Sequence, residues 1–168
     1  TAPGCCYWDP SSGEIEAEKL EDLDAVVHLA GEPLIGLRWT ANKKQEIWKS
    51  RVKGTALLAK CLAGLEKPPK VFVSASAIGF YGDRALDGMT EDDGPGDGFL
   101  AELCKAWEDA AIPAREKGIR VVHPRIGIVL TPSGGALKQM LPAFQLGAGA
   151  RFGKGKRFMS WIDHDDLL

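Results

Sequence analysis

The stretch Val71-Phe-Val-Ser-Ala-Ser-Ala-Ile-Gly-Phe-Tyr81-Gly-Asp83 decides the fold of this chain. It opens with apolar residues on both sides of the backbone, which is typical of a strand buried in a parallel sheet. It then runs into Ser74, Ser76 and a glycine-tyrosine turn at Tyr81. Ligands of open α/β sheets bind beyond the carboxyl ends of the strands. The stretch therefore predicts a strand whose end lies at a ligand site.

The apolar run at residues 25–30 and the segment Arg120-Val-Val-His-Pro124 predict two further strands. Helical periodicity separates the three runs. One helix is expected to begin near Thr40, whose hydroxyl can cap its first turn, and to end at Gly64. Alternating strands and helices predict one α/β domain with a Rossmann-like, doubly wound parallel sheet, covered by helices on both faces.

The second helix is expected to begin near Phe99 and to lose its regular form at Pro113, with Gly118 closing the segment. Residues 126–130 are expected to continue extended after the third strand. The chain begins without Met, and Asp165-Asp166-Leu167-Leu168 reads as the first turn of a helix. We therefore expect the chain to be a piece of a longer polypeptide.

Composition argues against several classes of partner. The 168 residues carry a net charge of −2 without a basic tract, which disfavours nucleic acid. The sequence has no apolar run near the ~20 residues that span a bilayer, and no signal peptide. The four cysteines lack C-x-x-C spacing, and the three histidines are far apart, so no metal site is expected. These features favour the cytoplasm, or an organelle interior if a transit peptide was removed.

The three strand ends supply the candidate ligand residues. They are Leu29-Ala30-Gly31, then Ser74 to Ser76, then Pro124-Arg125. Small residues at such positions let a flat or phosphorylated ligand approach the backbone. The alternative is that Ala30 and Gly31 only fit a tight turn.

A set of motifs, together covering most of the chain, resembles the extended short-chain dehydrogenases/reductases. The resemblance is narrower to their atypical "epimerase family" branch, often labelled nucleoside-diphosphate-sugar epimerase. The motifs are Asp24-Ala-Val-Val-His-Leu-Ala-Gly31, Ser50-Arg51, Gly54-Thr55, Val73-Ser-Ala-Ser76, Tyr81-Gly82, Trp107-Glu108, Arg125-Ile-Gly-Ile-Val-Leu130, Gly134-Gly135, Met140-Leu-Pro and Trp161-Ile162.

The resemblance implies a Rossmann fold that binds a nicotinamide dinucleotide, NADP or NAD, usually the phosphorylated form. The family's Gly-rich phosphate turn would lie upstream of Thr1, so the first βαβ unit is missing and binding by the isolated piece should be poor. Residues 1–168 would be the central part of one such domain, with the start of a substrate-binding region near 134–168. The candidate cofactor-binding residues are Leu29, Ala30, Gly31, Arg51, Ser74, Pro124 and Arg125.

Active relatives combine a Ser or Thr with a Tyr and a Lys spaced Y-x-x-x-K on the next helix. Ser76 matches the Ser, but alignment on Glu108 puts Leu100 at the Tyr position and Cys104 at the Lys position. Leu cannot transfer a proton. Tyr81 is the candidate replacement, with a pocket wall or turn aromatic as the alternative. Ser76 and Tyr81 are therefore the candidate catalytic residues.

Several side chains keep two interpretations. Arg125 could hold a carboxylate or phosphate, or pair with an acidic residue such as Asp165 or Asp166. His123 is interpreted as a core histidine with its hydrogen bond satisfied. A basic cluster corresponds to a diphosphate clamp in sugar-nucleotide relatives, or is an exposed loop; its members are Arg151, Lys154, Lys156 and Arg157.

The function keeps two interpretations as well. One is an epimerase- or oxidoreductase-like enzyme acting on a small or nucleotide-linked substrate. The other is a dinucleotide-binding regulator or scaffold without turnover.

Overall fold

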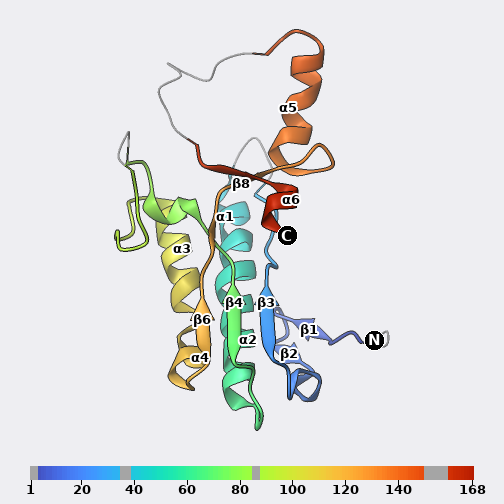
Figure 1. Ribbon diagram of the computed structural model, residues 1–168, viewed down its shortest axis with the longest axis vertical. Coiled ribbons are helices and arrows are strands. Elements are labelled where there is room, and N and C mark those ends of the chain that lie inside the picture. The colour runs from blue at the N-terminus through green and yellow to red at the C-terminus, as the bar shows by residue number, and fades with distance from the viewer. Residues whose placement is uncertain (1–3, 35–38, 85–87, 150–158) are drawn as a thin grey trace.

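The computed structural model describes residues 4–34, 39–84, 88–149 and 159–168. Its centre is a three-stranded sheet of β3 (Ala25–His28), β4 (Val71–Ser74) and β6 (Arg120–Val122), in the order β3-β4-β6. Both pairs are parallel, with Ala25 opposite Val71 and Val71 opposite Arg120. The expectation of three neighbouring parallel strands is confirmed (Figure 1).

Each central strand ends two residues earlier than expected. After β4 and β6, the chain continues into a second set of short strand pairs. Ala75 donates its N–H to His28, and Ser76 donates to Pro124. From there β5 (Ser76–Ala77) pairs in parallel with β7 (Arg125–Ile126). Further on, β8 (Ile128–Leu130) pairs in parallel with β9 (Trp161–Asp163). The strand ends therefore fan apart above the central sheet.

The first expected helix is present, but it has three parts: α1 (Ala41–Trp48), a π-helical turn η2 (Lys49–Lys53) and α2 (Gly54–Gly64). Thr40 caps it as expected, since its hydroxyl accepts the N–H of Lys43 at 3.2 Å.

The second expected helix is α3 (Phe99–Asp109), followed by the short α4 (Ile112–Glu116). Pro113 lies in the first turn of α4, where its missing N–H costs nothing. Gly118 ends the segment at a positive φ of 93°, a conformation that favours glycine.

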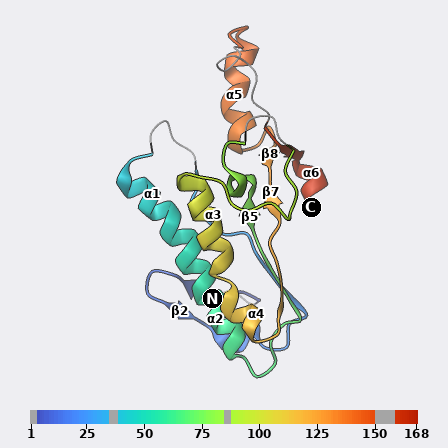
Figure 2. The same ribbon diagram turned by 90° about the vertical axis from the view of Figure 1, so that its left-hand side faces the viewer.

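The described helices that connect the central strands lie on one face of the sheet (Figure 2). A core forms between them and β4, and its buried members include Leu58, Leu62, Phe72, Ala111, Ala114 and Ile119. The reason for the single layer is topological. Right-handed crossovers between strands added in one direction place every helix on the same face.

In the described part of the chain, no helix covers the other face, where Val27 and Leu29 are each 62% exposed. The second layer of a doubly wound sheet is laid down only where the strand order reverses. The covering of both faces that the apolar strands predict is therefore not provided by these residues.

Smaller elements flank the sheet. At the amino end, β1 (Trp8–Asp9) and β2 (Glu14–Ile15) form an antiparallel hairpin, followed by η1 (Ala17–Leu20). Past β5 comes η3 (Ile78–Tyr81), which carries Tyr81. At the carboxyl end, α5 (Gly135–Gln145) stands away from the central sheet without a buried residue, and α6 (His164–Leu167) follows β9 (Figure 1). Among the described helices, none is long and apolar enough to cross a bilayer.

Candidate functional site

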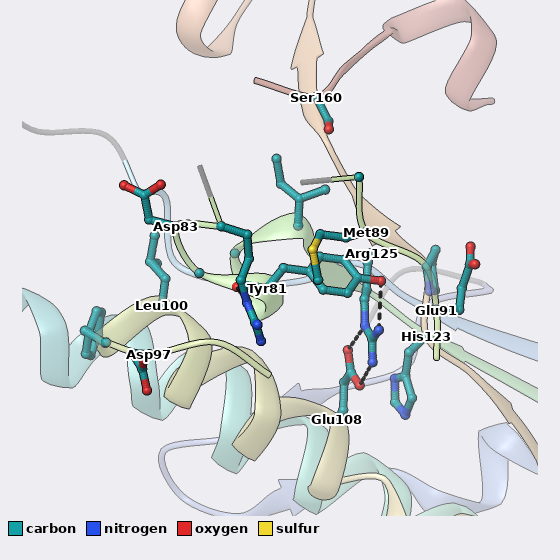
Figure 3. A pocket seen from close by; sticks show the side chains of 18 of the residues that line it. Tyr81, Asp83, Met89, Glu91, Asp97, Leu100, Glu108, His123, Arg125 and Ser160 are labelled. Carbon is teal, nitrogen blue, oxygen red and sulfur yellow. Dashed lines mark hydrogen bonds and ion pairs between the residues drawn. The ribbon is translucent and has the colours of Figure 1, made fainter. Parts of the chain in front are cut away.

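A cleft of about 1350 Å³ opens where the strands fan apart. It lies beyond the carboxyl ends of β4 and β6, between η3, the start of α3 and the segment that follows β6 (Figure 3). Its lining residues include Trp39, Tyr81, Phe99, Leu100, Glu108, His123, Pro124 and Arg125. This position agrees with the site that the strand-end argument predicts.

A chain of hydrogen bonds links Tyr81, Arg125 and Glu108 along one wall of this cleft (Figure 3). The Nη1 atom of Arg125 donates to the Tyr81 hydroxyl at 2.9 Å. The Nε and Nη2 atoms donate to the two carboxylate oxygens of Glu108 at 2.9 and 3.0 Å. The guanidinium carbon lies 3.5 Å from the ring centroid of Phe80. Arg125 is therefore fixed by a bidentate ion pair and by an aromatic face.

The charges of this pair are secured by the same contacts. Hydrogen bonds with Glu108 raise the pKa of Arg125 above its usual range, although burial opposes them. Burial alone would raise the pKa of Glu108, but hydrogen bonds from Arg125 and Ser76 outweigh burial and lower that pKa below its usual value. At neutral pH the wall therefore holds a guanidinium and a carboxylate.

Of the two interpretations of Arg125, the structure contains the pairing with an acidic residue, but the partner is Glu108 of α3 and not Asp165 or Asp166. Sequence reasoning used Glu108 only to align α3 and gave it no role in the site. One signal was available: Glu108 follows the buried Trp107, and an acidic residue next to the apolar face of a helix needs a partner when it is shielded from water.

The Tyr81 hydroxyl acts as the acceptor in its hydrogen bond with Arg125. A guanidinium has five donors and no acceptor, so Tyr81 accepts from Arg125 and keeps its own O–H proton for another partner. The geometry thus presents a hydroxyl donor beside a fixed guanidinium.

Ser76 lies beneath this wall. It is 3% exposed, and its Oγ donates to Glu108 at 2.7 Å. It is not among the described residues that line the cleft. Ser74 is fully buried, and its Oγ has no hydrogen-bond partner in the described part of the chain. The hydroxyl of Ser76 therefore orients Glu108 in this structure.

The α3 positions that correspond to the missing Tyr and Lys carry no polar replacement. Leu100 is 37% exposed and lines the cleft. Cys104 is 2% exposed, and burial raises the pKa of its thiol, which keeps it protonated. Lys105 points to solvent and pairs with Asp109 at 2.6 Å. Leu100 thus gives the cleft an apolar surface in place of a phenol.

His123 is a half-buried residue on the same side of the sheet as Glu108. Its Nδ1 lies 3.1 Å from the carbonyl oxygen of Ser74, and its Nε2 is buried with no partner among the described residues. Burial lowers the pKa of His123, although Ser74 and Glu108 oppose this. Burial also lowers the pKa of His28, which is 5% exposed. Both rings are therefore neutral at neutral pH.

These two histidines predict a loss of stability in mild acid. As the pH falls below about 6.5, His28 and His123 bind protons in the unfolded chain but stay neutral in the folded chain, where their pKa values are lowered. Unfolding therefore becomes more favourable. We expect Tm to fall between pH 7.5 and pH 5.5, and to fall less in the His28→Gln, His123→Gln double variant. The control is His164→Gln, an exposed histidine. Equal pH dependence in parent and double variant would contradict this assignment.

The candidate cofactor residues are divided between two cavities. Pro124 and Arg125 line the large cleft, whereas Ala30 and Gly31 line a smaller cavity of about 540 Å³. Trp8, Pro10, Ser11, Glu32, Glu46, Lys49, Ser50 and Lys53 complete the smaller one. Leu29 is exposed at the edge of the sheet. Arg51 lines neither cavity, and its Nη1 donates to the carbonyl oxygen of Glu32 at 2.9 Å.

The predicted diphosphate clamp cannot be located in the structure. The basic cluster of Arg151, Lys154, Lys156 and Arg157 lies outside the described residues. Among the described residues, no group of three His, Cys, Asp or Glu side chains could hold a metal ion.

Residues 9–168 match the sequence profile of the NAD dependent epimerase/dehydratase family. The chain belongs to this family. Its fold is accordingly the Rossmann-like α/β fold of NAD(P)-binding epimerase family proteins, and the family resemblance drawn from the sequence is confirmed.

Individual epimerase family proteins are similar over nearly the whole chain. An epimerase family protein of Mycobacterium bovis is 44% identical over 163 residues, which are 95% of this chain and 52% of that protein. A structure described as the nucleoside-diphosphate sugar epimerase from Corynebacterium glutamicum is 41% identical, with a TM-score of 0.81 over 98% of this chain and 34% of that one.

The human epimerase family protein SDR39U1, crystallised with NADPH, is 36% identical with a TM-score of 0.81, over 88% of this chain and 51% of that one. The chain thus spans about half the length of the curated relatives it matches.

Proposed function

We propose that this chain is the central part of an NADP-linked oxidoreductase- or epimerase-like enzyme in which Tyr81 is the proton donor. The observation that carries the proposal is the hydrogen bond from Arg125 to the Tyr81 hydroxyl, inside a cleft at the carboxyl ends of parallel strands. In this proposal the phenol, with a fixed cation beside it, supplies the proton that the Tyr supplies in active relatives. Tyr81 comes from the 3-10 helix η3 and Arg125 from the strand β7, instead of both from one α-helix.

The residues at the end of β3 fit a bound dinucleotide. Ala30 and Gly31 are small and exposed, and they border a cavity that also carries Lys49 and Lys53. Such a surface can receive the flat and phosphorylated parts of a nucleotide. NADPH is favoured over NADH because the similar human SDR39U1 was crystallised with it. When bound, the nicotinamide supplies hydride transfer. Leu29 and Ser74 remain proposed neighbours of the same path.

The chain's own residues would then act in fixed roles. Tyr81 gives its proton to a substrate oxygen as that oxygen gains electrons, and Arg125 stabilises the phenolate that remains. Glu108 holds Arg125 in place, and Ser76 holds Glu108. The apolar surface of Leu100 keeps water from the reacting carbon. Aromatic side chains at the cleft mouth, Trp39 and Phe99, suit a small or nucleotide-linked substrate with a flat ring.

A regulator or scaffold without turnover is the second candidate, for a specific reason. Ser76 is buried against Glu108, and the α3 position that faces the cleft carries Leu100. A site of this kind can bind and orient a ligand without moving a proton. We place either activity in the cytoplasm or an organelle interior.

One set of assays on the intact protein separates these candidates. Calorimetry should show binding of NADPH at micromolar to millimolar concentration. Oxidation of NADPH by simple carbonyl compounds should follow, while UDP-sugar epimerisation should be absent or very weak because the Tyr–Lys pair is missing. Binding without any turnover would favour the regulator. Failure to bind either NADPH or NADH at millimolar concentration would reject both candidates. Robust UDP-sugar epimerisation would refute the expectation that this reaction is absent or very weak.

The loop that backs Tyr81 offers a test of its positioning. A Cβ at Gly96 would overlap the carbonyl oxygen of Tyr81 and lie 2.9 Å from the Cα of Gly82. Gly96→Ala should therefore shift Tyr81 and lower kcat about tenfold, since small misplacements of a reacting group are costly. The matched control is Gly94→Ala, where a Cβ meets nothing within 4 Å. Equal activity of the two variants would show that this contact does not position Tyr81.

A further inference from the structure

Glu32 ties the loop after β3 to the helix that follows it. The N–H of Glu32 donates to the Oγ of Ser50 at 3.0 Å. Its carbonyl oxygen accepts from the Nη1 of Arg51 at 2.9 Å, and its carboxylate accepts from the Nζ of Lys43 at 2.5 Å. The backbone donor, the backbone acceptor and the side chain of Glu32 are thus all engaged from α1 and η2. Glu32 follows directly on Ala30 and Gly31.

The guanidinium of Arg51 is packed against Gly31 and Trp107. A Cβ at Gly31 would lie 3.1 Å from the Arg51 Cζ, so the absence of a side chain at Gly31 is what allows this approach. The Cζ also lies 5.1 Å from the ring centroid of Trp107. The indole N–H of Trp107 donates to the hydroxyl of Thr55 at 2.9 Å, which fixes the ring. Arg51 therefore joins the β3 loop to α3.

The π-helical turn of η2 explains how two adjacent residues, Ser50 and Arg51, both form hydrogen bonds with the backbone of Glu32. Successive residues of an α-helix point about 100° apart, yet the adjacent Ser50 and Arg51 both reach the backbone of one residue. The Ser50 hydroxyl donates to the carbonyl oxygen of Ile47 at 3.0 Å, which leaves its lone pairs to accept the Glu32 N–H. π-Helical turns are rare in proteins, and those that occur are frequently found at functional sites.

We infer that Arg51 is a positioning residue that sets the Ala30–Gly31 backbone for the dinucleotide and does not itself bind the dinucleotide. The inference rests on the proposed cofactor binding. Lys49, Ser50 and Lys53 line the smaller cavity, but Arg51 between them does not. Its guanidinium donates a hydrogen bond to Glu32 and packs against Gly31 and Trp107. This changes the role that the family resemblance suggests for Arg51, from ligand contact to support of the loop.

Two measurements on the intact protein test this role. The first needs no ligand: amide hydrogen exchange of residues 29–34 in the free protein. Arg51→Met should raise exchange of this loop at least tenfold, and Arg51→Lys should raise it nearly as much, because Lys cannot reproduce a stacked planar fork. The control is Lys49→Met, which removes a neighbouring cation that lines the cavity and should leave loop exchange unchanged.

The second measurement is the Kd for NADPH of the same variants. Arg51→Met should weaken binding about tenfold or more, and Arg51→Lys should not restore it. Ser50→Ala, a milder change that removes the acceptor of the Glu32 N–H, should weaken binding in the same direction even if Arg51→Met folds poorly. Unchanged loop exchange in Arg51→Met, or full NADPH affinity in Arg51→Lys, would overturn the inference and indicate a direct charge contact.

The two proposals fail separately. If the parent protein binds no dinucleotide, the proposed function is lost, and so is the purpose assigned to the loop. The exchange data would then still decide whether Arg51 anchors the loop.

Discussion

Replacing Tyr81 with Phe is expected to lower kcat/KM for a carbonyl substrate by about 10²–10⁴-fold, the usual contribution of general acid–base catalysis. The substitution removes one oxygen atom and keeps the ring, which packs edge-on against Phe80 at 5.5 Å between centroids. Folding and NADPH affinity should therefore change little. Steady-state kinetics, thermal unfolding and calorimetry on the same preparations measure the three quantities.

The chain supplies its own matched control for this prediction. It contains two tyrosines, and the other, Tyr7, is 45% exposed on the amino-terminal segment. Tyr7→Phe should leave kcat/KM unchanged. Ser76→Ala should cause a smaller loss than Tyr81→Phe, because Ser76 acts through Glu108 and Arg125. Full turnover by Tyr81→Phe would remove Tyr81 from the mechanism, and full turnover by Ser76→Ala would remove the serine.

Replacing Glu108 with Gln is expected to destabilise the protein by about 3–5 kcal/mol, the usual cost of removing one partner of a shielded ion pair. The side chains of Glu108 and Arg125 are 13% and 18% exposed, so water can solvate the orphaned guanidinium only in part. The lower end of that range is expected, because neither side chain is fully buried. Urea unfolding monitored by tryptophan fluorescence gives the free energy of unfolding.

The adjacent residue on α3 provides the control for Glu108. Asp109 also pairs with a cation, Lys105, but both side chains are at least half exposed. Exposed pairs contribute little because water screens them, so Asp109→Asn should barely change the free energy of unfolding. Similar losses in Glu108→Gln and Asp109→Asn would show that the Arg125 pair is no more important than a surface pair.

The sequence by itself determined the central sheet, its order of elements and the family. The segments at 25–30, 71–76 and 120–124 correspond to β3, β4 and β6, because the strand side chains that pack against the helices must be apolar. Thr40 and Gly118 marked helix ends through local capping and a positive φ. The absence of a Tyr–Lys pair from α3 was also readable, since it depends only on residue identity and spacing along one helix.

The partners of the polar side chains were decided only by the tertiary structure. Side chains on a strand alternate between faces, and whether Ser76 faces the cleft or α3 depends on how β5 leaves the sheet. Glu108 reaches both Ser76 and Arg125, which are 32 and 17 residues away along the chain. Arg51 likewise meets Gly31 through a π-turn that no local pattern announces. Local chemistry fixes the elements, but contacts between distant residues exist only once the helices pack on the sheet.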